Sequence, residues 1–248
     1  LGDGELALPD LTMTLTTDAG VFSPDRVDPA TKLLLQEAVE LAPAPADRTE
    51  VHLLDLGCGY GPIALTLARR FPTATVWAVD ANHRALELCG ANAAAQGLDN
   101  VRICAATDDD PLAHVPDDVT FAGMWSNPPV RIGKAAMTAL LTAALDRLSA
   151  TGSAHLVVHR HLGADSLQRS LTAAGWTVTR RLSRRGIRLF DVSGRLVKGF
   201  VDGVVPAGAH TIAWDGRNDA GRSVASGIYL VEMTAGEFSE TKKLVLVR

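Results

Sequence analysis

Short apolar runs alternate with amphipathic stretches along the middle of the chain, from about Val51 to Val192. The amphipathic stretches predict helices, of which the clearest covers 133–152, where apolar residues recur at steps of three and four and Gly152 supplies a C-terminal stop. Strands that alternate with helices are typical of a mostly parallel sheet covered by helices. The pattern therefore predicts an α/β domain over 51–192. Its strands are predicted at 51–57, 75–80, 101–106, 121–127 and 153–161.

The segment before this domain has a different pattern. Alternating residues at 6–22 predict a small hairpin, and the apolar periodicity at 31–42 predicts a helix that ends before Pro43 and Pro45. Together these elements form an N-terminal hairpin and helix over 1–50, which we expect to pack against the α/β domain.

Helical periodicity disappears after about Ser193, and short alternating runs follow, separated by glycine-containing turns. This pattern predicts a separate all-β module over 193–248. Its strands are predicted at 195–201, 209–215, 227–235 and 240–248. Its expected core aromatic residues are Phe200, Trp214 and Tyr229.

Three alternate glycines follow the first predicted strand of the α/β domain, in the sequence DLGCGYGP at 55–62. Glycines let the backbone turn sharply and approach a ligand closely, and the helix that follows begins with unpaired N–H groups. Asp80 ends the next strand, at the spacing from Asp55 at which a Rossmann-type acid reaches ribose hydroxyls. The glycine spacing fits neither a dinucleotide fingerprint nor an ATP phosphate loop, which favours S-adenosylmethionine as the ligand.

This stretch resembles motif I of the class I S-adenosylmethionine-dependent methyltransferases, which implies a Rossmann-like methyltransferase sheet. The resemblance implies that Asp55 holds the methionine ammonium group and that Asp80 accepts hydrogen bonds from both ribose hydroxyls. It also implies that Ala81 borders the adenine and that Asp108, after the third strand, reads the adenine amine. The residues expected to line the methionine and ribose are Gly57, Cys58, Gly59 and Gly61.

A second motif, SNPP at 126–129, follows the strand predicted at 121–127. An Asn side-chain oxygen and the carbonyl before a proline can accept both hydrogens of an exocyclic amine and aim its lone pair at the donor methyl group. A neutral amine that attacks a cationic donor needs no strong general base, so alignment carries most of the catalysis. The motif is similar to that of amino-methyltransferases, with Val130 where an aromatic residue is usual; the alternative is a simple turn. The catalytic residues so implied are Asn127, Pro128, Pro129 and Val130.

Three longer stretches, at 20–35, 126–134 and 161–171, narrow the resemblance over about 1–192. They resemble the small-domain family of small-subunit ribosomal RNA (guanine-N2) methyltransferases, although Ala30 stands where a Gly is common. This resemblance implies an enzyme that methylates guanine N2, with ribosomal RNA or the small ribosomal subunit as its partner.

Residues 187–248 resemble the C-terminal part of the immunoglobulin-like domain of flagellar hook-capping proteins, which implies an incomplete β sandwich. Both resemblances claim the strand at 186–192. In the methyltransferase fold this strand forms a terminal antiparallel hairpin with 176–182 and inserts beside the strand at 153–161. Because burial of each apolar side chain contributes roughly 1.5–3 kcal/mol, we expect the large domain to keep the strand.

The chain has 24 Lys plus Arg against 28 Asp plus Glu, and its net charge of −4 argues against indiscriminate polyanion binding over the whole surface. Contact with RNA is therefore expected to be local. The candidate RNA-binding residues are Arg131, Lys134, Arg160, Arg181, Arg184 and Arg185. The arginines at 179–188 have a second interpretation, as a charged edge that blocks pairing between sheets.

Several kinds of site are not expected. No apolar run reaches the roughly 18 residues that span a bilayer, and the first residues lack the order of a signal peptide. We therefore expect no membrane partner and a cytoplasmic location. Three irregularly spaced cysteines, together with His155, His159 and His161 on one strand face, give no complete metal-ligand set.

Two other functional hypotheses stay open at this point. The chain could be a non-catalytic surface or interaction protein with a remnant methyltransferase fold. It could also be an amino-methyltransferase that acts on DNA adenine or on a protein glutamine, because these enzymes share the Asn-Pro-Pro motif.

Overall fold

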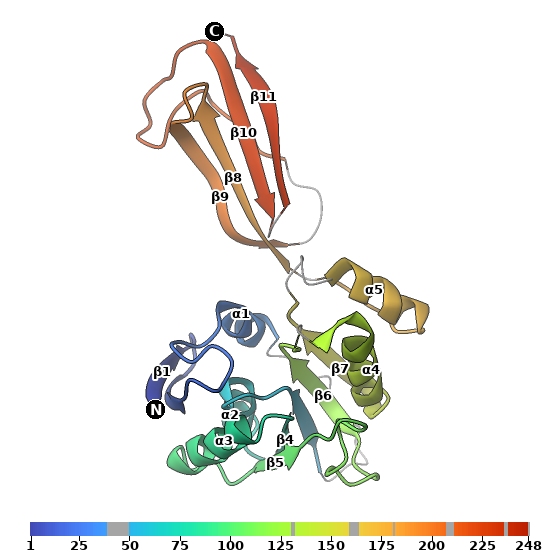
Figure 1. The fold of residues 1–248 in the computed structure, drawn as a ribbon. Coiled ribbons are helices and arrows are strands. Elements are labelled where there is room, and N and C mark those ends of the chain that lie inside the picture. Colours follow the sequence, from blue (N-terminus) through green and yellow to red (C-terminus); the bar gives the residue numbers. More distant parts are fainter. Residues whose placement is uncertain are drawn as a thin grey trace. The chain divides into compact units, whose positions relative to one another are not determined.

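In the computed structural model the described residues form a five-stranded sheet, a four-stranded sheet and a two-stranded hairpin (Figure 1). The five-stranded and the four-stranded sheet each have a hydrophobic core. The chain divides into two compact units, Leu1–Val158 and His159–Arg248. The structure describes residues 1–38, 50–129, 132–158, 164–180, 182–206, 211–235 and 238–247.

The first unit is built on a parallel sheet with the strand order β5-β4-β3-β6-β7. Its strands are β3 (His52–Leu56), β4 (Thr75–Asp80), β5 (Val101–Ala105), β6 (Phe121–Ser126) and β7 (Leu148–Leu156). The chain runs from β3 through β4 to β5 on one side and then returns to the other side of β3 with β6. Ligands of open parallel sheets bind at such a reversal of strand order, outside the carboxyl ends of the strands. The predicted Rossmann-like sheet is therefore confirmed.

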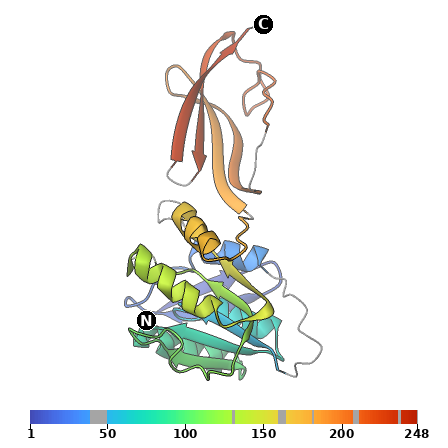
Figure 2. The same cartoon turned by 90° about the vertical axis from the view of Figure 1, so that its right-hand side faces the viewer.

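The connecting helices follow from this topology. They are α2 (Pro62–Arg70), α3 (His83–Ala95) and α4 (Lys134–Leu145). Because the crossovers in parallel sheets are right-handed, a reversal of strand order moves the helices to the opposite face. Figures 1 and 2 show α2 and α3 on one face of the sheet and α4 on the other. The sheet is thus covered on both faces, which explains why its strands read as continuous apolar runs.

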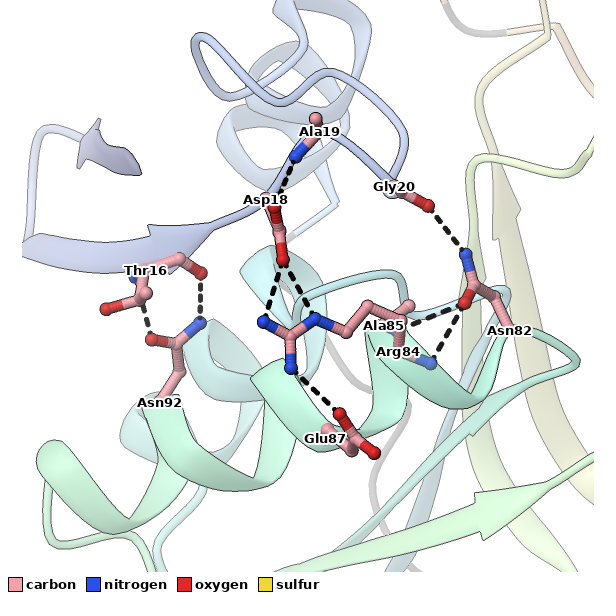
Figure 3. Close-up of polar contacts among 9 residues, drawn as sticks. All are labelled: Thr16, Asp18, Ala19, Gly20, Asn82, Arg84, Ala85, Glu87 and Asn92. Carbon is pink, nitrogen blue, oxygen red and sulfur yellow. Dashed lines mark hydrogen bonds and ion pairs between the residues drawn. The ribbon is translucent and has the colours of Figure 1, made fainter. Parts of the chain in front are cut away.

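The N-terminal residues form the predicted hairpin, β1 (Gly2–Ala7) and β2 (Thr12–Thr17), followed by α1 (Pro29–Glu37). The hairpin is joined to α3 by polar contacts (Figure 3). The Thr16 backbone N–H donates to Asn92 Oδ1 at 2.8 Å, and Asn92 Nδ2 donates to the Thr16 carbonyl at 3.0 Å. Because Asn92 is buried, these two bonds fix the position of β2 along α3.

The helix predicted at 133–152 is shorter than expected, because α4 ends at Leu145 and β7 begins at Leu148. Gly152 lies inside β7, where an added Cβ would be 2.7 Å from the Phe121 carbonyl oxygen. The glycine therefore allows close approach of β6 and β7 at an irregular point of their pairing, and it does not end a helix. The strand predicted at 153–161 correspondingly ends at Leu156.

The second unit contains α5 (Ala164–Ala173) and an antiparallel sheet with the order β11-β10-β8-β9. Its strands are β8 (Leu182–Asp191), β9 (Leu196–Pro206), β10 (Gly227–Ala235) and β11 (Phe238–Leu246). The sheet has a small core of its own, in which the Trp214 ring meets the Tyr229 ring edge-on at 4.9 Å. The core also contains Leu189, Val197 and Phe200. The predicted all-β tail and its three core aromatic residues are confirmed.

The expectation that the strand at 186–192 closes the methyltransferase sheet in a terminal hairpin is wrong. β8 lies inside the C-terminal sheet, where Leu189 pairs with Lys198 of β9 and Val231 of β10. A tight turn after Asp191 makes β9 the nearest available partner, so this hairpin forms locally. The tail buries Leu189 completely, whereas Val192 at the end of the predicted strand is exposed. Residues 176–180 form no strand, and neither do 211–215 of the strand predicted at 209–215.

No helix within the described ranges is both long enough and apolar enough to cross a membrane. The described residues also contain no group of three His, Cys, Asp or Glu side chains placed to hold a metal ion. His155 stacks on Trp125 with 5.0 Å between ring centroids, which gives it a packing role. His159 and His161 lie outside the described residues.

Candidate functional site

The candidate site lies at the carboxyl ends of β3, β4 and β6, which are neighbours in the sheet. Asp55 is in β3, Asp80 ends β4, and Asn127 directly follows β6. A Cβ added to Gly57 would be 3.7 Å from Pro129 Cδ and 4.0 Å from the Asn127 carbonyl oxygen. The glycine loop and the Asn-Pro-Pro motif are therefore neighbours in space, although they are far apart in the sequence.

The glycine loop is held in place by β4 and by its own backbone conformation. The N–H groups of Gly57 and Cys58 both donate to the Val79 carbonyl, at 2.8 and 2.9 Å. The loop residues with positive φ are Gly57 (+76°), Gly59 (+56°) and Gly61 (+101°). At Gly61 an added Cβ would be 2.5 Å from Leu65 Cδ1 and 2.8 Å from Cys89 Sγ, so only glycine fits at the start of α2.

Replacement of Gly61 by alanine should destabilise the first unit by about 2–4 kcal/mol, because it combines a left-handed conformation with overpacking. Gly59→Ala is the matched control, since its φ is also positive but nothing lies within 4 Å of the added Cβ. Its cost should be limited to about 1–2 kcal/mol. Chemical denaturation of both variants measures the difference. Equal destabilisation would contradict the steric role assigned to Gly61.

Asp55 is a fully buried carboxylate beneath the glycine loop. Its Oδ2 accepts a hydrogen bond from the Ala64 N–H at 2.8 Å, in the first turn of α2. Its Oδ1 has no hydrogen-bond partner among the described residues. Burial raises the pKa of Asp55 well above its usual value, and the charge of nearby Asp80 adds to the rise. A cation placed against Oδ1 would satisfy this oxygen and stabilise its charge.

Tyr60, on the same loop, carries a hydroxyl group that can donate a hydrogen bond, whereas the Asp55 oxygen can accept one. Its hydroxyl is buried and lacks a partner within the part of the chain that the structure describes. Burial, with a contribution from the charge of Asp28, raises the pKa of Tyr60 to about 12. The hydroxyl therefore stays protonated at neutral pH and is available as a donor to an anion.

Asp80 is the second acid of the site and is half-buried. Its Oδ2 accepts from the Gly59 N–H at 2.8 Å, and its Oδ1 accepts from the Asn82 N–H at 2.8 Å. Each oxygen keeps a further lone pair for a ligand hydroxyl. Ala81 follows it and is exposed, and Asp108 is exposed in the turn after β5 at the same edge of the sheet.

The segment after β2, at residues 18–20, lies beside the first turn of α3, which follows Asp80 (Figure 3). The Asp18 carboxylate accepts two hydrogen bonds from the Arg84 guanidinium, at 2.7 and 2.9 Å. The Gly20 carbonyl accepts from Asn82 Nδ2 at 2.9 Å. These contacts hold residues 18–20 against the start of α3, where Asn82 is two residues after Asp80. The segment then continues to the start of α1.

The Asn-Pro-Pro motif meets this segment at α1. Asn127 is half-buried, and its Nδ2 donates to Asp28 Oδ2 at 3.2 Å and to Thr31 Oγ1 at 3.1 Å. Pro128 is buried and Pro129 is exposed. Sequence reasoning did not single out Asp28 or Thr31 as site residues. The sequence feature that could have indicated them is their position at the start of a helix, inside the stretch at 20–35 that carries the family resemblance.

The basic residues predicted to bind RNA are only partly described. Lys134 is exposed in the first turn of α4. Val130, Arg131, Arg160 and Arg181 lie outside the described residues. The backbones of Arg184 and Arg185 are in β8, opposite Val204 and Gly203, so these positions belong to the second unit. Two other arginines of 179–188 have acidic partners, since Arg180 pairs with Asp165 and Arg188 with Asp202.

Comparison with protein families shows the family to which the chain belongs. The methyltransferase small domain family matches residues 12–181, which is more than half of the chain. The chain belongs to this family. The FlgD Ig-like domain matches residues 166–237, which overlap the end of the methyltransferase match, and this agrees with the resemblance expected for the tail.

Individual relatives of the methyltransferase agree with this assignment. The uncharacterized protein YbxB of Bacillus subtilis is 38% identical over 62% of this chain and 72% of its own length. Ribosomal RNA small subunit methyltransferase C of Shewanella piezotolerans is 34% identical over 64% of this chain and 43% of its own length. A solved T. thermophilus 16S rRNA N2 methyltransferase, in complex with S-adenosylmethionine and guanosine, has a TM-score of 0.56 and 27% identity. That match covers 68% of this chain and 45% of the other, so the chain spans less than half the length of these ribosomal RNA methyltransferases.

The predicted methyltransferase activity and its cofactor, S-adenosylmethionine, agree with the family and with the solved neighbour that contains the cofactor. The groups left unmatched in the site fit this molecule chemically. Asp55 Oδ1 needs a cation and the Tyr60 hydroxyl needs an acceptor. The amino-acid end of S-adenosylmethionine carries an ammonium and a carboxylate group, and its ribose carries the hydroxyls that Asp80 can accept.

Proposed function

We propose that this methyltransferase transfers a methyl group to an exocyclic amine, and that the amine is guanine N2 of small-subunit ribosomal RNA in the cytoplasm. The observation that carries the proposal is that the glycine loop and the Asn-Pro-Pro motif are neighbours, because a Cβ added to Gly57 would be 3.7 Å from Pro129 Cδ. This proximity supports a reaction at the junction between the cofactor loop and the acceptor residue Asn127. The solved relative that contains guanosine supports guanine as the base.

The proposed mechanism relies on positioning. When bound, S-adenosylmethionine would supply a methyl group on a cationic sulfur. Asp55 and Asp80 would hold the cofactor, and the loop residues that would lie against it are Gly57, Cys58, Gly59 and Gly61. Asn127 has two acceptors, its side-chain oxygen and its backbone carbonyl before Pro128, which together orient an NH₂ group. An amine so oriented would take up the methyl group as the donor sulfur leaves as a neutral thioether, and the surplus proton would pass to water. Alignment of the two reactants supplies most of the rate in such a reaction.

The proposed RNA contacts begin beside this junction. Lys134 lies in the first turn of α4, a helix end that already favours anions, and no acidic residue occupies that turn. We therefore assign Lys134 to a phosphate of the substrate. The further proposed phosphate contacts are Arg131, Arg160, Arg181, Arg184 and Arg185.

The proposed function is tested by incubating the chain with labelled S-adenosylmethionine and four acceptors. These are small ribosomal subunits, naked small-subunit RNA, adenine-containing DNA and a glutamine peptide. The expected result is labelled N2-methylguanosine after digestion of the RNA. Label in adenine or in the peptide would assign the site to another amine. Cofactor binding without transfer to any acceptor would favour the non-catalytic hypothesis.

Replacement of Asp80 by alanine should weaken S-adenosylmethionine binding by about 1–3 kcal/mol, since buried ribose hydroxyls would lose their acceptor. Calorimetric titration measures the affinity. Asp99→Ala is the comparison variant, because Asp99 is exposed before the amino end of β5 and has no role assigned to it in cofactor binding. An unchanged affinity in the Asp80 variant would refute its role in cofactor binding.

A further inference from the structure

Asp28 and Thr31 face the amide of Asn127 from the first turn of α1. Asp28 is the N-cap residue of this helix, and its Oδ2 accepts from the Thr31 N–H at 3.0 Å. The same oxygen accepts from Asn127 Nδ2 at 3.2 Å, and Thr31 Oγ1 lies 3.1 Å from that nitrogen. One capping carboxylate therefore joins the start of α1 to the end of β6.

These contacts fix which way the Asn127 amide points. A carboxylate oxygen can only accept hydrogen bonds, so the NH₂ end of the amide must face Asp28. Rotation of the amide by a half turn would bring its oxygen against the carboxylate, where two acceptors repel, and would lose the hydrogen bond to Asp28. The Thr31 hydroxyl can donate as well as accept, so it tolerates either orientation, and Asp28 is the group that decides which way the amide points. The amide oxygen is thereby left as the group that is free to accept from a substrate.

The support for this orientation is itself rigid. Pro29 occupies the first helical position after Asp28, where its fixed φ suits the helix start. At the other end of α1 the Ala38 carbonyl accepts from Trp125 Nε1 at 2.9 Å. Trp125 lies in β6, so this bond fixes the end of α1 against that strand. The tie at Ala38 does not depend on the contact between Asp28 and Asn127, and it supports the helix that carries Asp28.

We propose that Asp28, assisted by Thr31, is a positioning residue that holds the Asn127 amide with its oxygen toward the reacting amine. The inference rests on the proposed amine methylation, because it concerns the same Asn127. It adds that the N-terminal helix forms part of the catalytic arrangement through its capping residue. Asp28 touches neither substrate nor cofactor in this role and acts only through Asn127.

Two matched pairs of variants separate positioning from helix capping. Serine caps helices as well as aspartate, but its shorter side chain cannot also reach Asn127, so Asp28→Ser keeps the cap and removes the contact. Asp28→Asn offers an amide oxygen that can accept from both partners. Thr31→Val removes the second acceptor, and Thr31→Ser retains it.

The serine variant at 28 should lower kcat about tenfold or more, with the KM for cofactor changed less than about twofold. The Asp28→Asn and Thr31→Ser variants should stay within about threefold of the unmodified chain.

A double-mutant cycle tests whether Asp28 acts through Asn127. In the Asn127→Ala background, Asp28→Ser should cause no further loss of kcat, because the group it positions is absent. A further loss of the size seen in the single variant would show a general structural role and would overturn the proposal. Equal kcat for Asp28→Ser and Asp28→Asn would also overturn it.

A measurement without turnover completes the test. Nuclear magnetic resonance of the Asn127 side-chain NH₂ group should show slow hydrogen exchange in the unmodified chain and in Asp28→Asn, and fast exchange in Asp28→Ser. Similar exchange in all three chains would refute the fixed amide. If the unmodified chain methylates no amine, the proposed function fails, while the exchange rates still decide whether Asp28 fixes the amide.

Discussion

Replacement of Asn127 by alanine should reduce kcat by about a hundredfold or more while the affinity for S-adenosylmethionine stays nearly constant. The variant removes the side-chain acceptor that we assign to the reacting amine. It should leave the glycine loop intact, because the backbone of Asn127, which lies near Gly57, is unchanged. The cofactor acids Asp55 and Asp80 stand on other strands, β3 and β4, and keep their own contacts. Binding and turnover should therefore separate.

Three measurements check this expectation. Single-turnover methyl transfer gives the rate, calorimetric titration gives the cofactor affinity, and thermal unfolding reports whether the fold survives. A modest stability loss is expected, since Thr31 Oγ1 loses a donor. A parallel loss of binding and rate would indicate misfolding instead of lost alignment. An unchanged rate would refute the catalytic assignment of the Asn-Pro-Pro motif.

The parts of the site that lie at strand ends could be predicted from the sequence. Parallel strands covered on both faces appear as apolar runs, and their carboxyl ends meet at one edge of the sheet. The strand predicted at 75–80 has the observed bounds, so the position of Asp80 followed directly. The same reasoning brought Asp55 and Asn127 to one edge before any contact was known.

The contact of Asp28 with Asn127 could not be predicted in this way. The two residues are 99 positions apart, and no local pattern relates a helix cap to an Asn in a loop. The arrangement depends on how α1 packs on β6, which is a property of the tertiary structure. A pattern of an N-cap followed by proline predicts where a helix begins but does not predict which groups the cap contacts.

The misplaced strand has a related cause. Alternating apolar residues at 186–192 predict a strand, but they fit an antiparallel partner in either unit equally well. The choice depends on competition between partners, and proximity along the chain favours β9, which begins at Leu196. Burial of Leu189 was correctly expected, although its neighbours are Val197 and Tyr229 of the tail.

The placement of β8 leads to the second large effect. Leu189 is fully buried at the centre of the small C-terminal core, and its strand pairs with β9 and β10. Truncation of a buried leucine to alanine typically costs about 2–5 kcal/mol. A sheet of this size has little stability in reserve. Leu189→Ala should therefore unfold the C-terminal sheet at a temperature lower by about 10 °C or more.

The first unit should not respond to this change, since its sheet does not include β8. Calorimetry should show one transition moved to lower temperature and the other in place, with cofactor affinity and methyl transfer unchanged. Val192→Ala is the control, because that side chain is 71% exposed and its truncation should cost less than about 0.5 kcal/mol. If Leu189→Ala instead weakened cofactor binding together with the stability of the first unit, the strand would belong to the methyltransferase sheet. That result would restore the terminal hairpin expected from the resemblance and would overturn the pairing of β8 with β9 and β10.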